Sequence, residues 1–214
     1  MAPGNNAGSL SCNLRDCLLI YYESLRNAIL YYDSIVLYVK GGMNMELSPA
    51  RRDGVMDAMK RYSSMVYRLA YARTRNHADA EDIYQEVFLK LARADISFEN
   101  QEHVKAWLLR VTVNCSVNFF RSAWRRHVQT VEALPERASP LIDDARYESL
   151  NRALDSLPAR YRAVIHLYYY EEMSVDEISA VINTKPATIR SRLARGRERL
   201  KRELIQNKEA NPNA

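Results

Sequence analysis

A basic helical segment near the carboxyl end, residues 184–204, most constrains what this chain can fold into. Between Lys185 and Arg202 it contains eight basic residues and one acidic residue, Glu198. Its apolar residues and one glycine recur every three or four positions, the spacing of one helix face. These residues are Ile189, Leu193, Gly196, Leu200 and Leu204. We therefore predict an amphipathic helix that buries this stripe and leaves its arginines on the other side.

A second, shorter helix is predicted immediately upstream, from Ser174 to Ile182. Ser174 and Glu177 have the spacing of a capping box. The residues Asn183 to Pro186 break this helix, and proline suits the first turn of the next one. Two helices, a tight turn and a basic second helix indicate a helix-turn-helix that reads the DNA major groove. The alternative is a basic helix that is only a solvated surface, and the capped first helix and the proline argue against it.

The composition favours an all-α protein. The 214 residues include only 6 Gly and 7 Pro, and the apolar residues follow helical periodicity. The net charge of +5 permits a polyanionic partner. No uninterrupted apolar run of membrane length and no signal peptide is apparent, so we expect a cytoplasmic protein without direct membrane insertion.

The cysteines and histidines do not have the spacing of metal ligands. Cys12, Cys17 and Cys115 form no CxxC pair, and the four histidines are scattered. We expect reduced thiols, no metal site, no cofactor and no catalytic residues. Clustered carboxylates and a glycine-rich phosphate loop are also missing, which argues against an enzyme with a helical nucleic-acid module.

The order of patterns along the chain predicts two small helical domains joined by a flexible linker. Residues 1–44 form a leader of doubtful status, and residues 45–127 have a continuously helical pattern. Residues 128–145 contain prolines and adjacent aspartates that break helices, and we interpret them as the linker. Helical periodicity resumes over 146–207, and a polar tail, 208–214, follows.

The first helical zone contains an acidic amphipathic helix at about residues 79–91. Its apolar stripe comprises Ile83, Tyr84, Val87, Phe88 and Leu91. The polar residues lie mostly on its other faces; they are Asp79, Glu81, Asp82, Gln85 and Glu86. Solvation, together with the favourable interaction of acids with a helix N-terminus, is the alternative explanation for this acidic face.

A further helix is predicted from about His103 to Arg121. We expect it to bury Val104, Trp107, Leu108, Val111, Val113 and Val117 on one side. The polar residues Asn114, Asn118 and Arg121 share another face, which Arg125 extends and to which Arg126 adds charge. The preceding polar loop, 94–102, carries one aromatic residue, Phe98. Taken alone, the asparagines fit an ordinary polar face and Phe98 fits a loop anchor.

Two sequence blocks together resemble a known family. The residues DAEDIYQEVFLKLARADISF (79–98) and HVKAWLLRVTVNCSVNFFRSAWRR (103–126) resemble region 2 of bacterial sigma factors. The residues from 154 to 204, which begin LDSLPARYRAVIHLYYYEEMSVDEIS, resemble region 4. The short linker leaves no room for region 3, and nothing resembles region 1.1. The chain is therefore similar to the extracytoplasmic-function (ECF) group of the sigma-70 family, over roughly residues 50 to 206.

This resemblance implies a transcription initiation factor, which is not an enzyme, with a binding role for particular residues. Asp82, Gln85 and Glu86 would face the β′ clamp helices of core RNA polymerase, and the helices around 147–170 would rest on the β flap. Phe98 and its loop would receive a base flipped out of the −10 element. The other −10 residues would be Asn114 and Asn118, with Arg121, Arg125 and Arg126 on phosphates.

In the second zone the resemblance places a −35 contact surface on the basic helix. Arg190, Ser191 and Arg195 would touch the −35 element, with Thr188 and Arg192 near its backbone. The family also implies an anti-sigma factor, which could bring the protein to a membrane. The alternative function is a stand-alone helix-turn-helix regulator, which would need no polymerase-binding acidic helix.

The leader has a separate interpretation, based on codons. Lys40-Gly41-Gly42 can be encoded by a ribosome-binding sequence that ends about seven nucleotides before the Met45 codon. Residues 1–44 match no sigma region and are rich in tyrosine. We hypothesise that Met45 is the natural start. The alternative is a real N-terminal extension containing an amphipathic helix.

Overall fold

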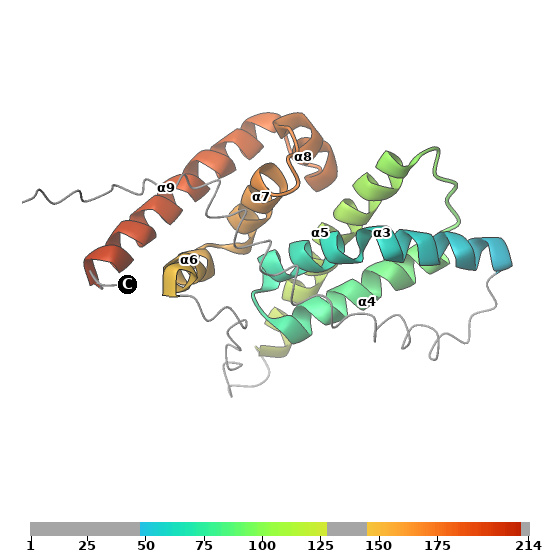
Figure 1. The fold of residues 1–214 in the computed structure, drawn as a ribbon, viewed down its shortest axis with the longest axis horizontal. Helices are drawn as coiled ribbons and strands as arrows, with labels where there is room; N and C mark the ends of the chain where they lie inside the picture. The colour runs from blue at the N-terminus through green and yellow to red at the C-terminus, as the bar shows by residue number, and fades with distance from the viewer. Residues whose placement is uncertain (1–47, 128–144, 211–214) are drawn as a thin grey trace, which may run out of the picture.

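The computed structural model describes the backbone of residues 48–127 and 145–210, and the side chains of 48–121 and 150–206. The leader 1–44 and nearly all of the linker 128–145 lie outside these ranges. The described residues form helices without strands, which confirms the all-α fold (Figure 1). The helices are α3 (Pro49–Thr74), α4 (His77–Arg93), α5 (Gln101–His127), α6 (Ala145–Ser156), α7 (Ala159–Tyr169), α8 (Val175–Ile182) and α9 (Pro186–Ala210).

Helices α3, α4 and α5 pack on one another and form the first helical unit. Helix α3 ends at Thr74, and the next residue, Arg75, caps it by adopting the left-handed conformation with φ 58° and donating its backbone N–H to the Tyr71 carbonyl. Asn76 then caps α4, because its side chain accepts a hydrogen bond from the Asp79 N–H at 3.1 Å. This tight connection makes α3 and α4 adjacent in space. All five residues of the predicted α4 stripe are buried, as expected.

The predicted buried stripe of α5 is partly wrong. Val117 is 39% exposed, whereas Thr112 and Ser116 are completely buried. Both hydroxyls donate to the carbonyl four residues earlier, Thr112 to Leu108 and Ser116 to Thr112, each at 2.7 Å. Local hydrogen bonds therefore allow two polar residues to take core positions, and the buried face lies to one side of Val117.

Helices α6 to α9 form the second helical unit, which contains the predicted helix-turn-helix. The Ser174–Glu177 capping box is present at the start of α8. Asn183 ends α8 in the left-handed conformation, with φ 53°, and α9 begins at Pro186, as the sequence predicts. Helix α9 continues to Ala210, so the predicted polar tail is helical at its first three residues, 208–210.

The stripe of α9 packs against α6, α7 and α8. Ile189, Leu193 and Leu200 are buried, and Leu204 is half-buried. Gly196 lies where α9 crosses α7, and a Cβ atom there would be 2.8 Å from Cδ1 of Ile165. Glycine therefore allows the close approach of these two helices.

The two helical units touch each other. Helix α3 packs against α7, and α5 packs against α8 (Figure 1).

Within the described ranges, no helix has the length and apolar character needed to cross a bilayer. The same residues contain no cluster of His, Cys, Asp and Glu that could hold a metal ion.

Candidate nucleic-acid interface

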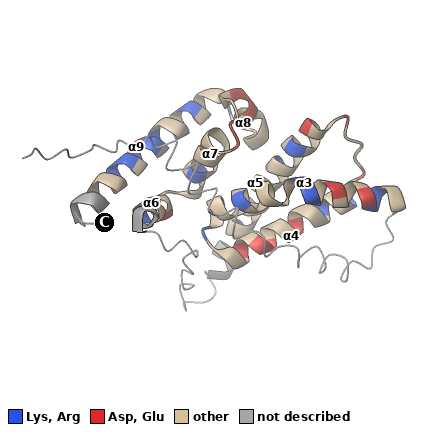
Figure 2. Cartoon of the chain, viewed as in Figure 1, with Lys and Arg blue, Asp and Glu red and all other residues tan. Residues whose placement is uncertain are grey.

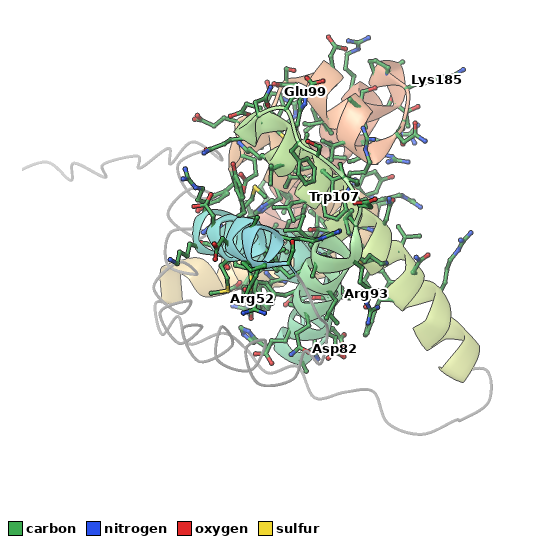
Figure 3. All side chains as sticks on the ribbon, turned by 90° about the vertical axis from the view of Figure 1, so that its right-hand side faces the viewer. Arg52, Asp82, Arg93, Glu99, Trp107 and Lys185 are labelled. Atoms are coloured by element: carbon green, nitrogen blue, oxygen red, sulfur yellow. The ribbon has the colours of Figure 1, made fainter. Side chains whose placement is uncertain are left out.

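The acidic face of α4 is the first candidate binding surface. Asp82 is exposed, and Gln85 and Glu86 are half-buried. Glu86 Oε1 lies 3.2 Å from Lys90 Nζ, one helical turn away. Figure 2 shows the acidic bands along α4, and Figure 3 shows Asp82 at the opposite edge of the view from Glu99, with Trp107 between them. The predicted polymerase-binding residues therefore share one side of one helix.

An open hollow of about 340 Å³ separates this acidic face from α5. It is lined by Asp82, Ile83, Glu86, Lys90, Cys115, Asn118 and Phe119. Lys90, Cys115 and Phe119 were not among the predicted site residues. The spacing of Glu86 and Lys90 on a helix was the signal that could have indicated Lys90. Asn118, predicted for DNA, thus lies beside the predicted polymerase-binding residues.

A lysine and a thiol meet in this hollow. Lys90 Nζ lies 3.4 Å from Cys115 Sγ. Burial raises the pKa of Cys115, and Lys90 opposes this rise. Burial lowers the pKa of Lys90, but hydrogen bonding and charge from Glu86 and Cys115 outweigh it, so the Lys90 pKa is raised. Lys90 therefore stays protonated and partly neutralises the hollow.

The second candidate surface follows α5 toward its carboxyl end. Asn114, Asn118 and Arg121 are all exposed, as their spacing predicts. Val117 and Phe120 are also exposed there, at 39% and 36%. Polar and apolar side chains thus alternate on this surface. The helix continues through residues 125 and 126, but the predicted side chains of Arg125 and Arg126 lie outside the described residues.

The loop between α4 and α5 comprises residues 94–100, two residues shorter than predicted, because α5 begins at Gln101. Phe98 is half-buried and packs edge-on against Trp107, with ring centroids 5.8 Å apart. Most of the loop is otherwise exposed, including Asp95, Ile96 and Ser97. Phe98 is therefore an anchor of the loop, while its surroundings remain accessible to a ligand.

The third candidate surface is the amino-terminal half of α9. Thr188, Arg190, Ser191 and Arg195 are exposed, and Figure 2 shows basic bands repeated along this helix. Arg192 is half-buried instead. The second helix of the helix-turn-helix thus presents a basic, largely solvent-facing surface; its role in reading DNA stays a prediction.

Arg162 of α7 connects the two helical units. Its Nε donates to the Ala72 carbonyl at 2.7 Å and its Nη2 to the Arg73 carbonyl at 2.6 Å. Its Nη1 donates within its own unit to the Leu157 carbonyl. These bonds place a guanidinium at the carboxyl end of α3, where helix carbonyls lack intrahelical partners. Sequence patterns did not indicate this residue.

Burial, together with the charges of Arg162 and Arg192, lowers the pKa of Arg73 to about 10. The charge of Arg192 acts on Arg73, which indicates that α9 passes near the end of α3.

A partly buried ion pair reinforces the contact between the units. Arg75 Nε lies 2.6 Å from Asp155 Oδ1, and Arg75 Nη2 donates to Asn151 Oδ1 at 3.0 Å. On the other side, Arg110 of α5 donates to the Ala180 carbonyl of α8 at 3.0 Å. Polar contacts therefore flank the packing of the two units at both ends.

A buried histidine of α7, His166, lies near Arg68 of α3. His166 is completely buried, and its Nε2 is 3.5 Å from Glu171 Oε1. Burial lowers the pKa of His166, and Glu171 opposes this while the Arg68 charge adds to it. Arg68 of α3 also lies 4.6 Å from the centroid of the Tyr170 ring. His166 is therefore neutral in the folded protein at pH 7.

Comparison with known families identifies the two units. The sigma-70 region 2 model matches residues 58–126, and the sigma-70 region 4 model matches residues 147–200. Together these matches cover more than half of the chain. The first unit therefore corresponds to region 2 and the second to region 4.

Relatives of known function are ECF sigma factors. SigE of Mycolicibacterium smegmatis is 34% identical over 162 residues, which cover 71% of this chain and 62% of SigE. SigW of Bacillus subtilis is 28% identical, over 72% of this chain and 90% of SigW. The sigma-E factor of Escherichia coli is 31% identical, over 56% of this chain and 71% of that protein. The chain belongs to the sigma-70 family of transcription initiation factors, in its ECF group.

Solved structures support the fold. The sigma factor RpoE of Bartonella quintana, in complex with the anti-sigma factor NepR, matches with a TM-score of 0.54 and 24% identity. This match covers 70% of this chain and 96% of RpoE. CnrH, in complex with the cytosolic domain of CnrY, matches with a TM-score of 0.52 and 19% identity, over 72% of this chain and 90% of CnrH.

Proposed function

We propose that this protein binds core RNA polymerase through α4, directs it to promoters with −10 and −35 elements, and assists melting. The observation that supports this most is the combination of an exposed acidic helix in region 2 with a basic helix-turn-helix in region 4. A stand-alone regulator has the second feature but needs no counterpart of the first. The proposed action is binding alone, without catalysis of bond chemistry.

Polymerase binding is assigned to Asp82, Gln85 and Glu86. Their acidic surface is complementary to a basic coiled coil, as the β′ clamp helices would provide. The adjacent hollow has an apolar floor, with Ile83 buried and Phe119 half-buried. A clamp helix with a basic residue next to an apolar one would fit both features. Helices α6 and α7 would rest on the β flap.

Promoter binding is assigned to two surfaces. The 94–100 loop with Phe98, and α5 with Asn114, Asn118 and Arg121, would hold unpaired −10 bases and their phosphates. A base that is paired and stacked in duplex DNA cannot enter such a pocket. Holding an unpaired base there therefore favours melting. The exposed residues of α9, principally Arg190, Ser191 and Arg195, would read the −35 element, with Thr188 and Arg192 near the backbone.

The same assignment places the protein in the cytoplasm, where polymerase and DNA are present. The solved relatives RpoE and CnrH are in complexes, with the anti-sigma factor NepR and with the cytosolic domain of CnrY, respectively. We propose that this chain also has an anti-sigma partner, through which it could associate with a membrane. Co-purification from the native organism, followed by mass spectrometry, would identify that partner.

The polymerase assignment is tested by charge reversal. The variant Asp82→Lys with Glu86→Lys should lose co-purification with core polymerase, because two attractive charges become repulsive. Asp53 and Glu198 are exposed acids elsewhere. The matched control, Asp53→Lys with Glu198→Lys, makes the same change in net charge and should bind normally. Normal binding by the first variant would refute the assignment, and circular dichroism checks that both variants fold.

A further inference from the structure

Two side chains of α3 contact the residue that directly follows the loop carrying Phe98. The Tyr62 hydroxyl donates a hydrogen bond to the Gln101 carbonyl at 3.1 Å. Arg61 Nη1 donates to the Gln101 side-chain Oε1 at 3.2 Å. Gln101 is the first residue of α5 and lies three positions after Phe98. A single residue at the carboxyl end of the loop is therefore held from a different helix.

Both of these donors are themselves held in place. Arg61 Nε donates to Asp57 Oδ2 at 2.8 Å, one turn earlier on α3. Tyr62 is half-buried against the core. Burial raises the pKa of Tyr62, and the charge of Glu102 raises it further, so the hydroxyl keeps its proton and remains a donor.

The loop has few other anchors. Asn100 caps α5 by accepting a hydrogen bond from the His103 N–H at 2.9 Å, and Phe98 packs on Trp107. At the other end, Arg51 of α3 lies 3.6 Å from the fully exposed Asp95 carboxylate, which is a weak surface contact. The Tyr62 and Arg61 contacts are thus the tertiary hydrogen bonds nearest to Phe98 among the described residues.

We propose that Tyr62 is a positioning residue for base capture. It would act through Gln101 by holding the start of α5, and with it Phe98, in the geometry that accepts an unpaired base. A pocket that is ordered before binding loses less conformational entropy when the base enters, so it binds more tightly. This inference rests on the proposed role of Phe98 and names a residue outside the DNA-contacting set.

The expected effect follows from the loss of one hydrogen bond. Tyr62→Phe keeps the ring and its packing but removes the donor. A net hydrogen-bond contribution of about 1 kcal/mol, if the loop holds its geometry only with this bond, corresponds to at most about a fivefold weaker affinity for unpaired −10 DNA. Discrimination between bases at the captured position should also decrease, because a loosened loop accepts more than one base. A merely structural role would not change that ratio.

The experiment uses holoenzyme and single-stranded oligonucleotides. Their sequence is the non-template −10 strand of a promoter selected by run-off transcription from a genomic fragment library. Fluorescence anisotropy compares wild type, Tyr62→Phe, Phe98→Ala and the double variant, with each base of the element substituted in turn. Tyr67 is a matched control on the same helix, because its hydroxyl is 2.6 Å from His77 Nδ1, away from the loop. Tyr67→Phe should leave affinity for the oligonucleotide unchanged.

Non-additivity decides the outcome. If Tyr62 acts through the Phe98 loop, Tyr62→Phe should weaken binding in the wild type but have no further effect in Phe98→Ala. If Phe98→Ala weakens binding while Tyr62→Phe does not, or if their effects simply add, the positioning role is wrong and the role of Phe98 stands. If Phe98→Ala has no effect, the proposed function of Phe98 is wrong, and the inference fails with it.

Discussion

The ion pair between Arg75 and Asp155 provides a direct test of how firmly regions 2 and 4 hold each other. The Arg75 side chain is 8% exposed and that of Asp155 is 27% exposed. Replacing Asp155 with arginine would remove the ion-pair partner of a buried guanidinium, which keeps its hydrogen bond to Asn151, and place a second cation beside it. The reciprocal variant, Arg75→Asp, would place two carboxylates together. The double variant restores opposite charges, and Asp is well suited to the left-handed backbone at position 75.

The expected magnitude depends on the environment of the pair. Exposed ion pairs contribute up to about 1 kcal/mol, whereas breaking a buried pair costs about 3–5 kcal/mol. One partner here is buried and the other is partly exposed. We therefore expect each single variant to lose about 2 kcal/mol of the free energy that favours the packed arrangement of the two units. This loss corresponds to a roughly thirtyfold shift toward the separated arrangement of the two units.

Pulsed electron paramagnetic resonance measures that arrangement directly. Nitroxide labels at Lys60 of α3 and Lys201 of α9, both exposed, report the distance between the units. In a background without native cysteines, the single variants should show a new population at longer distance. The charge-swapped double variant should recover much of the short-distance population. Identical distance distributions in all four proteins would refute the reasoning that this pair holds the units together.

Two further predictions concern the recognition helix and pH. Alanine at Arg190 or Arg195 should weaken promoter binding by holoenzyme by about 1–3 kcal/mol where the arginine contacts a base, and should reduce the salt slope by about 1 where it contacts a phosphate. Unchanged binding across a salt titration for both variants would place the recognition surface elsewhere. Burial lowers the pKa of His166 in the folded protein. The stability that the neutral side chain contributes is therefore present above its pKa in the unfolded protein, about 6.5, and is lost as the pH falls toward its pKa in the folded protein. In denaturant unfolding, His166→Gln should therefore lose less stability than the wild type between pH 7.5 and 5.5. Equal losses in the two proteins would contradict a buried neutral imidazole.

Helix positions and their buried faces were largely predictable because they depend on local spacing. The Ser174 capping box, the start of α9 at Pro186 and the complete stripe of α4 all follow from patterns within one or two turns. The errors on α5 have a local cause as well. Thr112 and Ser116 are polar by composition, yet each satisfies its hydroxyl on its own helix and so takes a core position that sequence patterns assign to apolar residues.

The contact between the two units could not be predicted in the same way. Arg162 is one arginine among many, and its role depends on carbonyls of Ala72 and Arg73, about ninety positions away in the chain. Periodicity carries no information about such long-range partners. The same limit applies to Tyr62, whose importance appears only when α3 is seen beside the start of α5. The residues assigned to polymerase and DNA stay predictions, since exposure alone makes them available for contact.

The proposed function requires the observed contact between the units to open. Elements centred near −35 and −10 are about 25 base pairs apart, which is roughly 85 Å along B-form DNA. With α7 packed on α3, and Arg192 of α9 near Arg73, the two proposed DNA-binding surfaces are held close to each other, so we expect them to reach both elements only after the units separate. Polymerase and promoter binding must therefore supply the free energy that separates the units. For this reason a variant that weakens the Arg75–Asp155 pair should bind its promoter at least as well as the wild type, even though its closed form is less stable.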